Sequence, residues 1–446
     1  MKLPTVVKRC KVLVVLLAAV PCLSSAALLE QAGRPTAPQG AIIPNRFIVA
    51  LKPGYGDAAT AAAGLVREVK AALHSTAAAA AGGTLPVRVC GPTSRVGTAA
   101  GGGAAGAAGG AAGSVGGNTA GGAAAGGLPR VPVAANEQVP AGVQLIGAVS
   151  SAGVANMAAG KPLVVAVVDS GVDSSHPDIN YVGGKAFVAP SAAVPGDSAD
   201  PATDLYGHGT HVAGIIGARN GGAGGVVGVA PGVGIFSLKV MDAQGVGSLS
   251  DAMDAVTWAA GPEGKAAGIA VINLSLAGYA DPAAPDYAAT RDYVCGVFQA
   301  ASAAGLVVVA AAGNYATDLR VTSMDPASAS VSSFSNYLAE PATAADRARL
   351  IAAPGNGILS TISFAREASG YRELSGTSMA SPHIAGVAAT CIASGACSAA
   401  GGFANAAVLQ AAAKQRAAAV PTYGFDGDAR STRGGKYYGY LTWDKW

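Results

Sequence analysis

The sequence predicts an α/β fold in which a parallel sheet is flanked by helices on both faces and is preceded by a small α+β domain. Short apolar runs recur in the second part of the chain, and they are apolar at odd and even positions alike. Runs of this kind are typical of strands that are buried on both faces. Helix-length segments lie between the runs, and this alternation favours a parallel sheet with helices on each side.

The expected elements of the main domain follow from these runs. We expect strands at 163–168, 234–240, 270–275 and 306–311. We expect helices at 208–218, 249–260 and 292–304. Three polar residues, Asp169, Ser275 and Asn314, fall at the ends of expected strands or just beyond them. Functional sites of parallel sheets gather at the carboxyl ends of the strands, so these residues predict a site at that edge.

The amino terminus has the three-part pattern of a secretory signal peptide over residues 1–26. A basic start with Lys8, Arg9 and Lys11 precedes an apolar run at 12–23, and small residues suited to signal peptidase follow. The run is shorter than the ~20 apolar residues that a transmembrane span needs, so we expect no membrane anchor. We expect a secreted, extracellular protein, and a plastid transit peptide is the main alternative that the sequence leaves open.

Two segments separate this signal from the main domain. Residues 42–96 hold a strand within 42–53, an amphipathic helix at 65–73 and a strand at 85–89, which together predict a small α+β domain. Residues 97–130 are nearly all Gly and Ala up to 127, and we interpret them as a flexible linker. Collagen is excluded because the glycines have no strict period and Pro is almost absent. The main domain is expected at 135–446.

Composition excludes several functions. The net charge of +3 is too small to indicate nucleic acid or a strongly acidic substrate as a partner, and no basic run with interleaved aromatic residues occurs. The hydrophobic content is 51%, but Ala supplies much of it, so it does not indicate a membrane protein. No spacing of Cys and His suggests a zinc site.

The cysteines limit the number of disulfides. Cys10 and Cys22 leave with the signal and Cys90 lies in the early domain, so three cysteines remain in the main domain. They allow at most one disulfide and one free thiol. Cys391 and Cys397 flank a glycine and are able to pair, but on one continuous helix they would point apart. The pairing of these two with each other or with Cys295 stays open.

Three short islands carry residues with chemical potential. They contain, in chain order, Asp169, His208 and Ser378, and they lie at 167–173, 207–214 and 376–383. Together they resemble the subtilisin (subtilase) family of serine proteases, of the proteinase K/subtilisin type, over residues 135–446. The resemblance implies a subtilisin-like fold and a secreted serine endopeptidase, with these three residues as its catalytic triad.

The chemistry of the triad explains the residue types. A serine hydroxyl is a poor nucleophile and needs a base within hydrogen-bond reach. His208 would accept the proton of Ser378, and Asp169 would hold the histidine tautomer and stabilise the imidazolium. Ser378 precedes an apolar run at 380–389, so its oxygen is expected near a helix N-terminus, which favours negative charge.

Residues beside the triad are expected to support it. We expect Gly376 to let the backbone turn tightly before Ser378. We expect Gly207 and Gly209 to clear space around the His208 ring. Four further polar residues are expected to be structural or to lie near the site without taking part in chemistry: His211, His383, His176 and Asp173.

The resemblance also implies an oxyanion hole and a substrate cleft. Asn314, at the end of the segment 310–314, would donate from its side chain to the oxyanion. Two further segments would bind the substrate as added β-strands. Their residues are Gly245, Val246, Gly247, Ser275, Leu276, Ala277 and Gly278. Ala277 stands where the family usually has Gly.

The segment 45–53 resembles the first strand of the inhibitor-like propeptide of the family. It implies that 42–96 is a propeptide and that the chain is made as a proenzyme, with its own propeptide as an intramolecular inhibitor. Cleavage is expected between the linker and Val139, with Arg130 as one candidate. The expected partners are protein or peptide substrates, the chemistry needs no cofactor, and we expect a monomer.

The chain departs from the family pattern after Asn314. The segment 321–325 arrives early, which indicates a deletion in the wall of the substrate pocket. The alternative function is therefore a catalytically weak or inactive pseudoprotease that binds peptides. The loop 220–225 is a candidate for a structural calcium, although it offers backbone carbonyls and Asn220 but no carboxylate of its own.

Overall fold

The computed structural model describes residues 127–221, 224–276, 287–314, 322–432 and 434–446, and the backbone of three short strands before them. These strands are β1 (Leu13–Val14), β2 (Phe47–Ala50) and β3 (Val87–Cys90). The strand β2 pairs parallel with β3 and antiparallel with β1. They belong to the first of two units, and β2 and β3 overlap the strands expected early in the chain. The helix expected at 65–73 lies outside the described residues.

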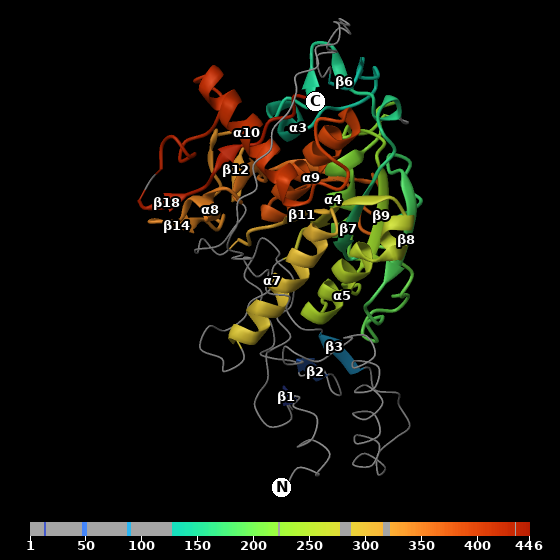
Figure 1. Ribbon diagram of the computed structural model, residues 1–446. Coiled ribbons are helices and arrows are strands. Elements are labelled where there is room, and N and C mark those ends of the chain that lie inside the picture. Colours follow the sequence, from blue (N-terminus) through green and yellow to red (C-terminus); the bar gives the residue numbers. More distant parts are fainter. Residues whose placement is uncertain are drawn as a thin grey trace, which may run out of the picture. The chain divides into compact units, whose positions relative to one another are not determined.

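The second unit contains a five-stranded sheet in which every neighbouring pair of strands is parallel (Figure 1). In spatial order the strands are β11 (Val307–Ala310), β10 (Ile269–Leu274), β7 (Val164–Asp169), β9 (Gly234–Lys239) and β8 (Tyr181–Ala186). Four of them coincide with the predicted apolar runs, so the predicted parallel sheet is confirmed. The sequence did not predict β8, because this edge strand is only partly buried and carries two glycines instead of an apolar run.

Helices cover both faces of this sheet, as predicted. Val165 and Val167 of β7 pack in one buried cluster with residues of α4 (His208–Gly217) and α9 (Thr377–Ser394). The intervening residues of β7, Ala166 and Val168, pack in a second cluster with α5 (Leu249–Ala260) and α7 (Tyr287–Ala303). Since successive side chains of a strand point to opposite faces, the two clusters are the two faces of the sheet. The helix α7 begins at 287 and not at 292, because residues 287–291 contain no helix breaker.

The remaining elements frame the sheet. The shorter helices are α3 (Ala141–Leu145), the 3₁₀ turn η1 (Met157–Ala159), α6 (Pro262–Ala266) and α8 (Ala344–Arg347), and the long helix α10 (Phe403–Ala419) lies near the end of the chain. A separate four-stranded sheet, which is mixed, has the order β13 (Ser330–Val331), β12 (Thr322–Asp325), β15 (Ile351–Pro354) and β19 (Tyr440–Leu441). Small sheets pair β4 (Arg130–Val131) and β5 (Val149–Ser150) with β6 (Gly153–Ala155), β14 (Leu338–Ala339) with β18 (Lys436–Tyr437), and β16 (Ile358–Thr361) with β17 (Tyr371–Leu374).

The two ends of the parallel sheet differ. Asp169 is the last residue of β7, and Asn314 follows β11 closely, so both lie at the carboxyl ends of the strands. A hollow of about 780 Å³ opens at the opposite, amino ends, where Val164 and Gly234 line it. That hollow is therefore separate from the predicted site. Among the described residues, no helix has the length and hydropathy to cross a membrane.

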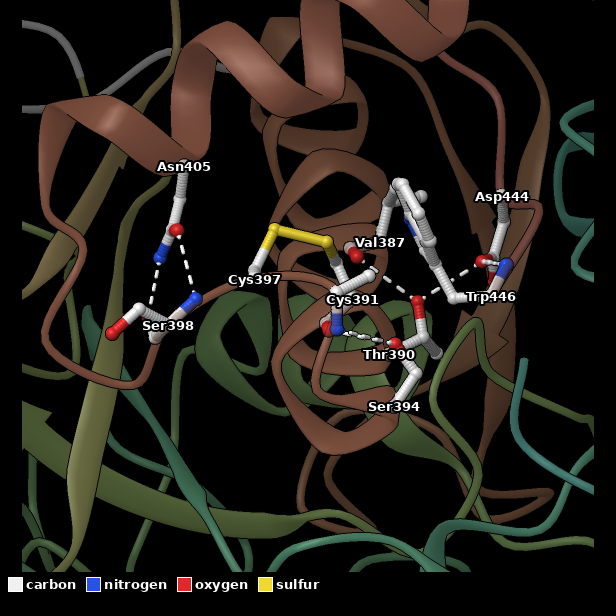
Figure 2. The surroundings of a disulfide bond; sticks show 10 residues. Val387, Thr390, Cys391, Ser394, Cys397, Ser398, Asn405, Asp444 and Trp446 are labelled. Carbon is white, nitrogen blue, oxygen red and sulfur yellow. Dashed lines mark hydrogen bonds between the residues drawn. A yellow bond between two sulfur atoms is a disulfide. The ribbon is translucent and has the colours of Figure 1, made fainter. Parts of the chain in front are cut away.

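A disulfide joins Cys391 to Cys397, and this resolves the pairing that the sequence left open. The helix α9 ends at Ser394, and Gly395 follows with a φ of 83°, so Cys397 lies in the loop and its N–H donates to the Cys391 carbonyl oxygen at 3.0 Å. Figure 2 shows the bond at the end of α9, beside the hydrogen bond from Thr390 to Asp444. Among the three cysteines of the described main domain, Cys295 is free and is exposed on α7.

Removing this disulfide should destabilise the domain modestly. We expect Cys391→Ala/Cys397→Ala to lower the free energy of unfolding by ~2 kcal/mol, because the closed loop is short and its entropy loss small. In a domain of this size that is a decrease in Tm of roughly 5 °C. Thermal unfolding followed by circular dichroism measures it, with Cys295→Ala as the control. An unchanged Tm would contradict the stabilising role of the bond.

Candidate active site

Asp169 and His208 form a close pair at the carboxyl edge of the sheet. His208 is the first residue of α4, and its Nδ1 lies 2.8 Å from Oδ1 and 2.9 Å from Oδ2 of Asp169. Asp169 is fully buried and His208 is 8% exposed. The backbone N–H of Ser170 donates to Asp169 Oδ1 at 2.8 Å and helps to fix the carboxylate. The carboxylate selects the tautomer that carries the proton on Nδ1, which leaves Nε2 free to accept a proton.

The surroundings of His208 raise its pKa above the usual 6.5. Burial alone would lower this pKa, because a charged imidazolium is costly away from water. The charge and the hydrogen bond of Asp169, together with the charge of Asp204, outweigh burial. The imidazolium is therefore stabilised more strongly than in water, as a base that is protonated during a reaction requires.

Glycines on both sides of His208 allow close packing. Gly207 has a φ of 89°, in the left-handed region that favours glycine. A Cβ on Gly209 would lie 2.1 Å from the carbonyl oxygen of Gly171. The second glycine therefore lets the loop after β7 approach α4, and through it Asp169 approaches the histidine.

Ser378 is the second residue of α9 and is 8% exposed. Its Oγ donates to the carbonyl oxygen of Ser275 at 3.1 Å rather than to His208. The backbone N–H of Ser378 has no partner within the helix, because the first four N–H groups of a helix have none. The nucleophile candidate thus lies where free N–H groups and the helix dipole favour negative charge, as expected.

The side chain of Ser275 supports α9 and does not face the cleft. Its Oγ donates to the carbonyl oxygen of Ser378 at 2.8 Å and lies 2.9 Å from Oγ of Ser381. Asn273 donates to the same Oγ from Nδ2 at 2.8 Å. Only the backbone of Ser275 is thus available to a substrate strand.

Asn314 is oriented by the start of α9. Its Oδ1 accepts a hydrogen bond from the backbone N–H of Thr377 at 2.6 Å, which directs its Nδ2 donor elsewhere. A Cβ added to Gly376 would lie 3.4 Å from this Nδ2 and 3.7 Å from the backbone nitrogen of Ser378. The space beside Gly376 is therefore bordered by two donors, which is the arrangement an oxyanion needs.

The tight turn predicted at Gly376 is wrong. Its φ of 161° and ψ of 163° are extended values that any residue adopts. Because Gly376 has no side chain, the space between Asn314 and Ser378 stays open.

The first predicted substrate segment forms a turn after β9. Gly245 has a φ of 71°, and Val246 exchanges hydrogen bonds with Asp242 and is 42% exposed. A Cβ on Gly247 would lie 2.1 Å from the Val240 carbonyl oxygen, so this glycine lets the turn close on its own strand. In the second segment, Leu276 is partly buried. Ala277 and Gly278 lie outside the described residues, as does most of the stretch after Asn314 where a deletion was predicted.

The other histidines of the described region support the fold. Nε2 of His211 lies 3.1 and 3.0 Å from two backbone carbonyl oxygens, and burial lowers its pKa to about 3. Nδ1 of His383 lies 2.8 Å from the carbonyl oxygen of Met379, and burial lowers the His383 pKa to about 4. His176 lies 2.9 Å from the Gly370 carbonyl oxygen. Their lowered pKa values keep His211 and His383 neutral near pH 7, so these two side chains add no charge to the site.

Sequence reasoning missed Asp204 and Lys239, which are both buried. Asp204 contacts the segments that carry Asp169 and His208, and Lys239 contacts the segment that carries Asp169. The one available signal was the position of Asp204 shortly before the helix at His208, where acidic residues stabilise a helix start.

The candidate calcium loop stays a prediction, since residues 222 and 223 lie outside the described residues. Both carboxylate oxygens of Glu137 accept backbone N–H groups of this loop, from Gly221 and Gly225. Oδ2 of Asp178 accepts from Val226 and from the hydroxyl of Tyr371. Oδ1 of Asp178 has no hydrogen-bond partner. One such oxygen is not enough for calcium, which prefers six to eight oxygen ligands. Among the described residues, no group of three or more His, Cys, Asp or Glu side chains is placed so that it could hold a metal ion.

Comparisons with known proteins cover this site. The model of the subtilase family matches residues 160–425, which include Asp169, His208, Asn314 and Ser378. Subtilisin DY from Bacillus licheniformis is 35% identical over 245 residues, which are 52% of this chain and 76% of that protein. Subtilisin E from Bacillus subtilis (strain 168) is 37% identical over 237 residues, which are 52% of this chain and 55% of that protein.

Among solved structures, a cold adapted subtilisin-like serine proteinase is similar with a TM-score of 0.49 and 28% sequence identity, covering 69% of this chain and 99% of its own.

Proposed function

Because the chain belongs to the subtilase family of serine-type endopeptidases, we propose that it hydrolyses peptide bonds with Asp169, His208 and Ser378 as its catalytic triad. The observation that carries the proposal is the contact between His208 Nδ1 and the buried carboxylate of Asp169 at 2.8 Å. It leaves His208 Nε2 as a base, with Ser378 at the start of the helix α9 that packs against α4.

The reaction begins with a rotation of the Ser378 side chain. In the resting chain its hydroxyl donates to Ser275, and a turn about χ1 releases it toward His208 Nε2. Catalytic hydrogen bonds of free enzymes often form only when substrate binds. His208 then takes the proton as Ser378 Oγ attacks the peptide carbonyl carbon, and Asp169 stabilises the imidazolium.

Two donors stabilise the oxyanion of the tetrahedral intermediate: Nδ2 of Asn314 and the backbone N–H of Ser378. His208 next gives its proton to the leaving amine, and the C–N bond breaks to leave an acyl-enzyme on Ser378. A water molecule, deprotonated by His208, attacks the ester and releases the acid. The proton returns to Ser378, so the residues end as they began.

The substrate is an extended peptide that adds a β-strand to the backbone of the segments 245–247 and 275–278. Main-chain hydrogen bonds of this kind bind many sequences, so they suit an endopeptidase that acts on protein substrates. The exposed side chain of Val246 offers an apolar contact at the first of these segments.

Replacing Asn314 by Ala should lower kcat by ~10²–10³ and leave KM nearly unchanged, because its donor acts only in the transition state. Steady-state hydrolysis of a chromogenic peptide measures both constants. Asn180→Ala, at the amino end of the sheet, is the matched control and should retain full activity. A rise in KM without a fall in kcat would assign Asn314 to substrate binding instead.

We propose further that the chain is a secreted proenzyme in which residues 42–96 inhibit the cleft. The side chain of Leu128 is buried in the core of the second unit, and Arg130 donates to the carbonyl oxygens of Ala148 and Gly153 from Nη1. Residues from 128 onward thus belong to the folded domain, and Arg130 offers a protease no free extended segment. We therefore place the maturation cleavage in the Gly/Ala linker before Leu128.

The mature amino terminus tests this placement. Amino-terminal sequencing of the protein recovered from an expression medium should give a start within 97–127. A start after Arg130 would contradict it, since β4 would then have been opened by the cleavage.

Active-site labelling tests the function as a whole. A fluorophosphonate should label the purified mature protein, and mass spectrometry should place the adduct on Ser378. Chains that bind a peptide substrate but take up no label would support the pseudoprotease instead. The family membership favours the enzyme over that alternative.

A further inference from the structure

Asp204 is a buried carboxylate in the loop before α4, and four donors surround it. Its Oδ1 accepts from Oγ of Ser170 at 2.8 Å and from the backbone N–H of Gly207 at 2.7 Å. Its Oδ2 accepts from the backbone N–H and from Oγ1 of Thr210, at 2.9 and 2.6 Å. The residue is 1% exposed.

These donors come from the two segments that carry the proposed base and its partner. Ser170 follows Asp169 directly, and Gly207 and Thr210 lie on either side of His208. We propose that Asp204 is a positioning residue for the triad, whose carboxylate ties the end of β7 to the first turn of α4 and so fixes Asp169 against His208. This inference rests on the proposed function, because a triad is what is being positioned.

Two further hydrogen bonds strengthen the same connection. The backbone N–H of Gly209 donates to Ser170 Oγ at 3.0 Å, and the backbone N–H of Asp173 donates to Thr210 Oγ1 at 2.9 Å. Each hydroxyl therefore accepts a hydrogen bond from one segment and donates one to Asp204, and we call such a pair of hydrogen bonds a relay. Both relays end at the Asp204 carboxylate.

The direction of these bonds fixes the charge of Asp204. Burial raises the pKa of Asp204 above its usual 3.8, and the hydrogen bonds from Thr210, Gly207 and Ser170 offset only part of this rise. All four neighbours donate, and both hydroxyls have committed their proton to the carboxylate, so no acceptor remains for a carboxylic acid proton. Asp204 is therefore ionised, because a protonated form would leave its own O–H and one neighbour unpaired.

A buried lysine balances this charge. Lys239, at the end of β9, donates from Nζ to the carbonyl oxygens of Ser170 at 2.6 Å and of Thr203 at 3.1 Å. These carbonyls belong to the residues that follow Asp169 and precede Asp204. Buried charges of opposite sign that share neighbours lower the cost of each other.

The charged groups around His208 come from each element that packs near it. Asp169 lies on β7, Asp204 lies in the loop before α4, and Lys239 lies on β9. His211 on α4 is neutral. Arg366 lies in the loop after β16, and its side chain is so close to Gly207 that a Cβ at Gly207 would contact it. Among them Asp204 is the second acid, after Asp169, whose charge acts on His208.

The test measures the pKa of His208 directly, in a chain that cannot hydrolyse peptides. In the Ser378→Ala background, the imidazole signals are titrated by NMR and that of His208 is assigned by its loss in His208→Gln. Asp204→Asn should lower the His208 pKa by roughly 0.5–1 unit, less than the effect of a charge in contact. Asp428→Asn removes a buried, salt-bridged carboxylate of the carboxyl-terminal loop and should leave the His208 pKa unchanged.

Activity of the chain with Ser378 intact gives the second reading. Asp204→Asn should lower kcat about 10- to 100-fold, because a small misplacement of catalytic groups is costly, and should move the acid limb of kcat/KM to lower pH. A merely structural role would lower the Tm and leave that limb in place. An unchanged His208 pKa in a folded Asp204→Asn chain overturns the proposal.

A gentler variant decides the case in which Asp204→Asn does not fold. Ser170→Ala keeps the charge and removes one relay, so kcat should fall roughly ten-fold with the His208 pKa unchanged. An unchanged kcat would overturn the positioning role. If Asp204→Asn moves the His208 pKa while the intact chain cleaves no peptide, the positioning stands and the proposed function fails.

Discussion

Replacing Asp169 by Asn should lower kcat by about 10⁴ and leave KM nearly unchanged. The backbone N–H of Ser170 donates to one oxygen of Asp169 at 2.8 Å, so an Asn at this position would turn its carbonyl oxygen there. Its amide N–H₂ would then face His208 Nδ1 and donate to it. The proton of the imidazole would move to Nε2, and His208 could no longer accept a proton from Ser378.

The same substitution should change the dependence of activity on pH. In the proposed mechanism neutral His208 is the active base, so kcat/KM should rise as pH rises through the His208 pKa. The raised pKa places that midpoint above 6.5. In Asp169→Asn, burial of the ring remains while the charge and hydrogen bond of the carboxylate are lost. The pKa of His208 should therefore fall, and the acid limb should move to lower pH.

A nearby acid provides the control. Asp173 lies in the loop after β7. It accepts hydrogen bonds from Ser175, Ser363 and Phe364 and does not contact His208. Asp173→Asn should leave the acid limb where it is in the unmodified chain. If Asp169→Asn retained kcat within a factor of ten, the role assigned to Asp169 would be wrong.

The sequence was sufficient to predict the main sheet because each central strand is buried on both faces. The β7 run is apolar throughout because its alternate residues pack against α4 and α9 on one face and against α5 and α7 on the other. A short run that is apolar at every position, repeated between helix-length segments, is specific to such a sheet. The edge strand β8 satisfies no such constraint, and its two glycines gave no pattern to recognise.

The positions of the candidate site residues were predictable from local sequence. Asp169, His208, Ser378 and Asn314 stand at strand ends and helix starts, and local sequence places each of them there. The contacts between those positions are long-range and leave no local signal. Asp204 joins two segments through four hydrogen bonds, and the side chain of Ser275 contacts α9. Neither set of contacts can be predicted from the spacing of residues along the chain.

The disulfide illustrates the same limit. Its formation depended on where α9 stops, and Gly395 in the left-handed region ends the helix between the two cysteines. A glycine near the end of an apolar helix is a common stop signal, but helix ends are uncertain by one or two residues. The pairing depends on whether α9 ends before Cys397, and an uncertainty of this size in the helix end left that question open.

The largest loss should follow from Ser378→Ala, which we expect to lower kcat by ~10⁶, the loss known for the nucleophile of subtilisin itself. No neighbouring hydroxyl can take its place. Oγ of Ser275 donates to the Ser378 carbonyl oxygen and is paired with Ser381, and both are buried below the first turn of α9. Hydrolysis of a chromogenic peptide at high enzyme concentration measures the residual rate.

A double variant separates a triad from three independent residues. If His208 acts only by accepting the proton of Ser378, then His208→Ala costs nothing further once Ser378 is gone. Ser378→Ala/His208→Ala should therefore be no slower than Ser378→Ala alone, whereas independent contributions would multiply. A further large loss in the double variant would mean that His208 activates something other than Ser378, and the triad would have to be reassigned. Equal residual rates would show that the two side chains, brought together from the starts of α4 and α9, work as one unit.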